Sequence, residues 1–303
     1  MPMLDVNAIV DPVILRGDRA IAYRDPAAHY HDGVFRVFHT QMHREEDDRY
    51  FAYVGVTRSE DLVEWSEPEI LTQRDQSLNY SSPGNVIHYG GEWLICWQTY
   101  PTPENQPTGD QTARVYIARS IDLEAWSTPE LLRVKGPDVP DVEMGRMIDP
   151  FLVEDRDQPG KWWCFYKQNG ASLSYTLDFE TWTYSGHVGA GENVCVLLDR
   201  EEYVLIHSPK NGIGVKRSTD LREWRDEGLL ALGQTNWPWA AGRLTAGQVL
   251  DLREDERVGK ALMFFHGSTA LGAAERETHG ESSLGIAWSD DLVSWSWAGS
   301  GNF

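Results

Sequence analysis

Three acidic residues stand at the start of apolar, strand-like runs in different parts of the chain. They are Asp25, Asp149 and Glu192. Carboxyl groups can act as general acids, general bases or nucleophiles. Held close together they repel one another, so one must keep a proton or a cation must bind, and such sites are typically functional. A single Asp before Pro is more often a turn or strand-start residue, so the interpretation depends on all three converging.

The sequence has five such strand starts in all, three of them acidic. After each of the five starts, the second strand-like run ends in a polar residue. This second set consists of His39, Gln98, Lys167, His207 and His266. A short turn joins each pair of runs, and in an antiparallel hairpin the end of the second strand lies beside the start of the first. Ser82 and Thr245 take the starting positions that lack a carboxylate. Both sets are therefore predicted to surround one mouth, with Lys167 beside Asp149, where its charge would keep the carboxylate ionised.

A repeated turn has to position these runs. Each copy has Ser or Thr, any residue, Asp, an apolar residue and, four residues after the Asp, Trp. The five copies start at Ser59, Ser120, Thr176, Ser218 and Ser289. The Asp carboxylate and the hydroxyl group can both accept hydrogen bonds from nearby backbone N–H groups, which favours a tight hairpin connection. A fixed turn that recurs with variable spacing is typical of a repeated supersecondary unit.

About four strand-like runs belong to each copy, which is the make-up of a propeller blade. We therefore predict an all-β fold, a five-bladed β-propeller with about four antiparallel strands per blade. The chain is expected to form one domain, because closed β architectures often exceed roughly 200 residues. This domain covers residues 1–303, with blades at about 23–71, 78–133, 146–186, 190–232 and 243–298.

The composition excludes several classes of partner. The chain has 303 residues and a formal net charge of −20, so it lacks the basic surface that nucleic acids or anionic membranes require. No segment is long and apolar enough to span a bilayer, and the N-terminal residues lack the basic and apolar regions of an export signal. Three cysteines in apolar runs, Cys96, Cys164 and Cys195, suit buried free thiols. A cytoplasmic location is the resulting expectation.

The repeated Ser-x-Asp-Leu-x-x-Trp hairpins and the acidic residues of the first, third and fourth units resemble the five-bladed β-propeller glycoside hydrolases. That group contains families 43, 32, 117 and 130, and family 43 is the closest in overall pattern. The resemblance covers residues 23–297. It implies that Asp25 is the base, Asp149 an orienting and tuning residue, and Glu192 the general acid. The sequence departs from family 43 after Glu192, where Asn193-Val194 replaces Gly-Pro or Ala-Pro, and it lacks the Asn-Asp-Pro-Asn-Gly of family 32.

The resemblance implies a glycosidase that cleaves a terminal, furanosidic sugar, such as arabinofuranosyl or fructofuranosyl, from short oligosaccharides or glycosides. One carboxylic acid protonates the leaving oxygen, while a carboxylate on the other face of the sugar activates water or attacks the anomeric carbon. Glu192, near the apolar Val194, is expected to be the acid and Asp25 the base or nucleophile. Asp149 is expected to orient the sugar and to stabilise positive charge in the transition state. No cofactor is required.

Several residues around the mouth are expected to contact the sugar, namely His39, Ser82, Gln98, Lys167, His207 and Thr245. Four further residues are expected to do so as well. Arg24 lies next to Asp25 in the sequence, and Arg243 can bind a sugar hydroxyl or an acidic group. Trp237 and Trp239 provide either a platform on which a sugar stacks or ordinary packing between blades, and the sequence favours neither.

His266 matches in position a residue that helps to hold an axial cation in many family 43 enzymes. The resemblance therefore implies a structural Ca²⁺ or Na⁺ in the central channel. For His39, His207 and His266 alike, the alternative is a structural hydrogen bond at the end of a strand.

Two other functions stay open. A phosphorylase resembling family 130 uses phosphate in place of water and needs a basic cluster at the mouth. The available residues are Arg146, Lys167, Lys210 and Arg243. A carbohydrate-binding propeller without catalysis would bind the same ligands and leave them intact. The expected partner is in each case a small oligosaccharide or glycoside.

Two long inserts, 101–113 and 267–283, are expected to rise around the same mouth. They would close one side of it and make a pocket, which admits one terminal sugar. Exo-action on short intracellular oligosaccharides is therefore predicted. The sequence does not reveal the sugar, the linkage or the oligomeric state.

Overall fold

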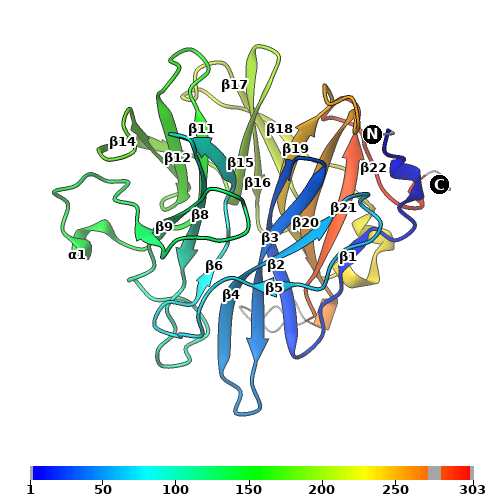
Figure 1. The fold of residues 1–303 in the computed structure, drawn as a ribbon, viewed down its shortest axis with the longest axis horizontal. Coiled ribbons are helices and arrows are strands. Elements are labelled where there is room, and N and C mark those ends of the chain that lie inside the picture. Colours follow the sequence, from blue (N-terminus) through cyan, green and yellow to red (C-terminus); the bar gives the residue numbers. More distant parts are fainter. Residues whose placement is uncertain (1–2, 272–280, 301–303) are drawn as a thin grey trace.

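Five antiparallel sheets are arranged around one centre in the computed structural model (Figure 1), which describes residues 3–271 and 281–300. The inner strands of neighbouring sheets are in contact, and the fifth sheet is in contact with the first. Each sheet has four or five strands. The predicted five-bladed β-propeller is therefore confirmed.

Each sheet is one blade, and the blades follow one another along the chain. Blade one contains β2 (Ile21–His31), β3 (Val34–Arg44), β4 (Tyr50–Ser59) and β5 (Glu69–Ile70). Blade two contains β6 (Tyr80–Ser81), β7 (Val86–Tyr89), β8 (Glu92–Thr99), β9 (Val115–Ser120) and β10 (Glu130–Leu131). Blade three contains β11 (Ile148–Glu154), β12 (Trp162–Lys167), β13 (Ala171–Thr176) and β14 (Trp182–Val188). Blade four contains β15 (Glu192–Asp199), β16 (Glu202–Ser208), β17 (Gly214–Ser218) and β18 (Arg225–Leu229).

Blade five is completed by segments from both ends of the chain. Its strands are β19 (Arg243–Leu252), β20 (Lys260–Ser268), β21 (Ser283–Ser289), β22 (Trp295–Ser296) and β1 (Val13–Leu15). The short β1 and β22 both pair with β21, at opposite ends of it. Figure 1 accordingly shows the N and C termini on the same side of the molecule. The predicted limits of 243–298 missed β1, because three residues are too few to show an alternating pattern.

Helical segments are short and lie in the connections between strands. Those that lie wholly within the described residues include the 3₁₀ helices η1 (Val6–Ala8), η2 (Gly233–Asn236) and η3 (Pro238–Ala240) and the α-helix α1 (Asp141–Met144). Within residues 3–271 and 281–300, none of the helices has the length and apolar character needed to cross a membrane.

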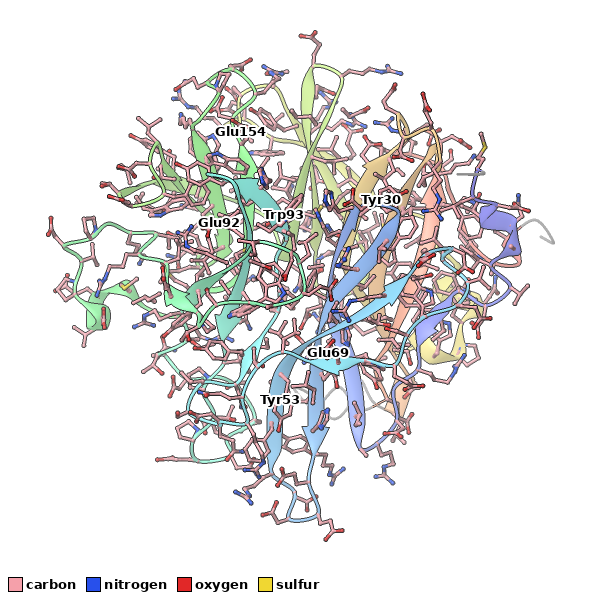
Figure 2. All side chains as sticks on the ribbon, in the orientation of Figure 1. Tyr30, Tyr53, Glu69, Glu92, Trp93 and Glu154 are labelled. Atoms are coloured by element: carbon pink, nitrogen blue, oxygen red, sulfur yellow. The ribbon has the colours of Figure 1, made fainter. Side chains whose placement is uncertain are left out.

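The hydrophobic core lies between the blades. Separate clusters lie between blades one and two, two and three, and five and one, while the largest extends across blades three, four and five. Figure 2 shows side chains filling the spaces between the sheets. All three cysteines are buried and free within this core, as predicted.

The five repeated turns contain the predicted hydrogen bonds. In the first copy, Ser59 Oγ accepts the N–H groups of Asp61 and Leu62 at 3.2 and 2.8 Å. Asp61 Oδ1 accepts those of Val63 and Glu64, both at 2.9 Å. The other four copies repeat this pattern. The bonds hold Leu62 in the left-handed region, at φ 67°, which is uncommon for a residue other than glycine.

The aspartates of the repeated turns are expected to make the fold less stable at acidic pH. Hydrogen bonds from backbone N–H groups lower the pKa of Asp122, Asp178, Asp220 and Asp291. A folded pKa below the unfolded value of about 3.9 stabilises the fold above that pH, and the stabilisation is lost as the pH falls through the folded pKa. We expect the urea midpoint of unfolding to drop below about pH 4.

The drop should be shallower after Asp122→Asn and Asp220→Asn together, because Asn keeps an oxygen acceptor but does not titrate. Urea titrations at pH 5, 4 and 3, followed by circular dichroism, measure the effect. A double variant whose midpoint falls as steeply as that of the wild type would contradict it.

Candidate active site

Each blade has one residue in the left-handed region near the start of its inner strand. These residues are Asp25, Ser82, Asp149, Asn193 and Ala246, with φ of 48°, 45°, 51°, 50° and 56°. In four blades the register of the first hairpin shifts at this residue, as it does at a β-bulge. Backbone strain of this kind in residues other than glycine gathers at functional sites. The bulges therefore indicate where on the propeller a site is to be sought.

A cavity of about 110 Å³ opens beside the bulges. This volume corresponds to several water positions at roughly 10–15 Å³ each. The predicted residues that line it are Arg24, Asp25, Ser82, Gln98, Asp149, Glu192 and Arg243. The floor separates the cavity from a narrower axial space of about 20 Å³ and consists of the residues that line both: Asp25, Ser82, Asp149 and Asn193.

The bulges change which residues correspond to one another. In blade four the residue equivalent to Asp25 and Asp149 is Asn193, and not Glu192. Glu192 lies one residue earlier, and its side chain is 33% exposed at the rim, whereas Asp25 is buried. Thr245 of blade five is fully buried and does not line the cavity, so the structure does not support its predicted sugar contact. The sequence could not show this shift, because Val194, Cys195 and Val196 form a continuous buried apolar run, which has no alternation for an extra residue to interrupt.

Hydrogen bonds from blade to blade hold the bulges in place. In all five blades, the backbone N–H of the left-handed residue donates to a side chain on the preceding blade, and in four of them the acceptor lies on the second strand of that blade's first hairpin. The pairs are Asp25 to His266 Nδ1 (3.0 Å), Ser82 to Thr40 Oγ1 (2.7 Å), Asp149 to Gln98 Oε1 (2.6 Å) and Ala246 to Ser208 Oγ (2.7 Å). In blade four the acceptor lies on the inner strand, because Asn193 donates its N–H to Asp149 Oδ2 at 3.4 Å. The floor of the cavity is thus fixed by its neighbours.

His39 and His207 do not reach the cavity. His39 is fully buried, and burial lowers its pKa to about 4. His207 accepts the backbone N–H of Gly191 at 3.0 Å, and burial likewise lowers its pKa to about 4. In both blades it is the next residue, Thr40 or Ser208, that contacts the neighbouring bulge. These two histidines are therefore structural residues in the core of their blades, and the structure does not support their predicted contact with the sugar.

Asn193 joins the two buried carboxylates of the floor. Its Nδ2 donates to Asp25 Oδ1 at 3.3 Å, and its N–H to Asp149 Oδ2 at 3.4 Å. Thr40 Oγ1 donates to the other oxygen of Asp25 at 3.0 Å, and Ser82 Oγ to the other oxygen of Asp149 at 2.7 Å. Each carboxylate is therefore held through both of its oxygens. The sequence signals Asn193 only as a departure from the family 43 pattern.

Asp149 holds its proton more strongly than an ordinary carboxyl group. Burial, followed by the negative charges of Glu192 and Asp25, raises its pKa to about 7. Lys167 was expected beside Asp149, but the hairpin register pairs it with Ile148, and it lines a separate hollow outside the cavity. The expectation that Lys167 keeps Asp149 ionised is therefore wrong.

Glu192 reaches the rim from blade four and pairs with an arginine of blade five. Arg243 Nη2 donates to Glu192 Oε1 at 2.6 Å. The apolar setting expected from Val194 is not found at the carboxylate, because Val194 is buried and lines the axial space behind the floor. Arg243 therefore fixes one oxygen of Glu192 and orients the carboxyl group over the cavity.

Trp237 and Trp239 are packing residues and form no platform in the cavity. Their rings stack on each other with a centroid distance of 5.3 Å. Both also stack on Phe265 of β20, at 5.7 and 6.0 Å. Both are buried and neither lines the cavity, so the structure supports the packing alternative.

The fold is shared with several solved structures. An exo-1,5-α-L-arabinanase from a bovine ruminal metagenomic library is 16% identical, with a TM-score of 0.62 over 93% of this chain and 98% of that chain. An exo-β-1,3-galactanase from Clostridium thermocellum is 17% identical, with a TM-score of 0.65 over 95% of this chain and 65% of that chain. A GH43 β-xylosidase/α-arabinofuranosidase from a compost microbial metagenome, in complex with xylotriose, is 14% identical. Its TM-score is 0.62 over 94% of this chain and 98% of that chain. This chain shares the fold of these enzymes.

No family model matches the chain, and no curated protein does. At identities of 14% to 17%, the likeness to family 43 structures shows the fold, while activity has to be argued from the site. The site does bring the three predicted carboxylates of blades one, three and four to one cavity.

The axial cation that the family 43 resemblance implies does not fit His266. The compost enzyme was solved in a calcium-free form. In this chain His266 Nδ1 accepts the N–H of Asp25, so the neutral ring carries its proton on Nε2 and has no lone pair left for a metal ion. Burial lowers the pKa of His266 well below its usual range, which keeps the ring neutral. Within the described ranges, no three His, Cys, Asp or Glu side chains converge in a way that could hold a metal ion.

Proposed function

We propose that the chain is a glycoside hydrolase that cleaves a terminal sugar from short oligosaccharides or glycosides through Asp25 and Glu192. The observation that carries the proposal is that Asp25, Asp149 and Glu192, from three blades, line one cavity. Holding three like charges together costs energy, and binding a neutral sugar does not require it. Glycosidic cleavage does require an acid and a base or nucleophile, and in most glycosidases these are carboxyl groups.

The positions of the carboxyl groups suit different roles. Glu192, at the exposed rim, can reach a leaving group that still extends into solvent, so we assign it as the general acid. Asp25, in the floor and held through both oxygens, faces the enclosed sugar, so we assign it as the base or nucleophile. Asp149, with its raised pKa, can donate a hydrogen bond to a sugar hydroxyl up to about neutral pH. These roles need no cofactor.

The cavity favours exo-action. Its volume of about 110 Å³ suits a single sugar unit better than the middle of a chain. The insert 101–113 lies against its wall, where the carbonyl oxygen of Gly109 accepts Arg146 Nε at 3.3 Å. The other insert, 267–283, lies partly outside the described residues. The choice of a furanosidic sugar rests on the sequence resemblance, and the structural neighbours include an exo-acting arabinanase.

Product analysis tests this proposal. We expect a monosaccharide as the first product from at least one oligosaccharide ladder of arabinose, xylose or galactose, followed by chromatography over time. Glu192→Gln should release it about a hundredfold more slowly, or slower still. Early internal fragments of mixed length would contradict exo-action. Binding without cleavage, equal in the wild type and in Glu192→Gln, would identify a carbohydrate-binding protein instead.

A further inference from the structure

A second hollow, of about 440 Å³, lies next to the cavity and shares Arg146 with it. Its wall combines positive side chains with neutral amides: Lys135, Arg146, Lys167, Gln111, Gln168 and Asn169. Among the described residues no acidic side chain lines it. The chain as a whole has 47 acidic and 27 basic residues, so a wall with three cations and no carboxylate contrasts with the rest of the molecule.

The three cations of the hollow have no carboxylate partner in the part of the chain that the structure describes. Many other basic side chains do, such as Arg133, which pairs with Asp141 at 2.7 Å. Burial, followed by the charge of Arg114, lowers the pKa of Lys135, so the positive charge of Lys135 is unfavourably placed. A bound anion would supply the missing partner.

The wall of the hollow is held rigidly. The buried Arg114 donates to the carbonyl oxygens of Gly145 at 2.8 Å and of Asp141 at 2.5 Å. Gln168 Nε2 donates to the carbonyl oxygen of Arg146 at 3.0 Å. The backbone on both sides of the hollow is therefore fixed before any ligand arrives, which reduces the entropy lost on binding.

An anion belongs in the hollow and not in the cavity. The cavity already contains Asp25, Asp149 and Glu192, which repel a negatively charged sugar. Arg146 borders both spaces, so a group that is joined to the cleaved sugar can lie in the hollow while that sugar lies in the cavity. The arrangement suits a neutral terminal sugar followed by an acidic unit.

We propose that the hollow binds an anionic substituent, a carboxylate or a sulfate ester, on the sugar unit next to the one that is cleaved. The inference rests on the proposed function and names its substrate class, acidic oligosaccharides with a neutral terminal sugar. Lys135 and Lys167 attract the anion as point charges. Arg146 orients it, because a guanidinium group can bind a carboxylate or sulfate through two N–H groups.

Binding of small probes to the wild-type protein tests the hollow without any cleavage. The probes are methyl β-D-glucuronide for the carboxylate, D-glucose 6-sulfate for the sulfate ester and methyl β-D-glucoside as the neutral control, titrated by NMR. We expect at least one acidic probe to bind about tenfold more tightly than the glucoside, the effect of about one charge-assisted hydrogen bond. The preference should shrink as salt is added.

The lysines provide the matched variants. The double variant Lys135→Gln and Lys167→Gln should bind the acidic probe and methyl β-D-glucoside with nearly equal dissociation constants, so that their ratio is close to one. Lys210→Gln, at an exposed lysine that lines neither space, should leave the ratio unchanged. If the double variant does not fold, each single variant should lower the ratio by itself.

Equal affinities for acidic and neutral probes, or a preference that survives when Lys135 and Lys167 are both replaced by Gln, would overturn the inference. Failure of the proposed function looks different, since the acidic preference would persist while no oligosaccharide ladder is cleaved. Inorganic phosphate adds one more outcome. Cleavage that depends on phosphate and yields a glycosyl phosphate would place a co-substrate in the hollow, and this too would overturn the inference.

Discussion

Replacing Glu192 by Gln is expected to slow the cleavage of glycosides with poor leaving groups by about a hundredfold or more. Gln cannot protonate the departing oxygen, but its side-chain oxygen can still accept the hydrogen bond from Arg243, so the fold should persist. Asp25→Asn should cost a similar factor, because an amide can neither take a proton from water nor attack the anomeric carbon. Measurements of kcat/KM, with circular dichroism to confirm folding, give both numbers.

The leaving group separates the two roles. A dinitrophenolate departs without protonation, so Glu192→Gln should recover most of the rate on dinitrophenyl glycosides, while Asp25→Asn should not. Glu69→Gln is the matched control, because Glu69 on β5 (Figure 2) also pairs with an arginine, Arg58 at 3.0 Å, but lies outside the cavity. Wild-type rates in either active-site variant would remove that residue from the mechanism.

The fold could be predicted because one turn recurs five times. Each copy specifies its own hydrogen bonds, such as those of Ser59 and Asp61, independently of the rest of the molecule. A local signal of this kind is readable from the residues alone. The pairing of β1 with β21 is different, because it joins Val13 to Gly285 across nearly the whole chain. Three residues carry no pattern that could announce such a partner.

The site could be predicted only in part. The start of each inner strand identified Asp25 and Asp149, because the Asp-Pro pair and the apolar run that follows it are visible in the sequence. The bulge that makes Asn193 their equivalent stayed hidden, because the buried run of Val194, Cys195 and Val196 behind it is continuously apolar and has no alternation to interrupt. The same shift exchanges His39 for Thr40 as the partner of the next blade. Side-chain placement within a correct fold depends on register, which a repeat motif does not specify.

The charged neighbours of the site residues could not be predicted from the sequence either. Glu192 was expected to lie in a partly apolar setting, yet its carboxylate pairs with Arg243, which lies 51 residues further along the chain. Lys167 was expected at Asp149 and instead faces the neighbouring hollow. Without Lys167, the surroundings of Asp149 are dominated by burial and by other carboxylates, and this reverses the direction expected for its pKa.

The ionisation of Asp149 is therefore expected to change kcat/KM near neutral pH. Its pKa is raised to about 7 by burial and then by the charges of Glu192 and Asp25. As the pH rises through this value, the carboxyl group loses its proton and the charge of the whole coupled site changes. The pH profile of kcat/KM should bend near pH 7 in the wild type. Asp149→Asn, which cannot ionise, should lose this bend.

The same ionisation predicts how stability changes with pH. Because the folded pKa of Asp149 lies above the unfolded value of about 3.9, its stabilising contribution is full below that pH and is lost as the pH rises through about 7. The wild type should therefore lose on the order of 1–4 kcal/mol relative to Asp149→Asn across this range. Urea unfolding of both proteins at pH 5 and pH 8 measures the change, since hydrogen bonds lost in the variant affect both pH values alike. A difference that stays constant, or that shifts toward the wild type at pH 8, would contradict a raised pKa of Asp149 in the folded protein.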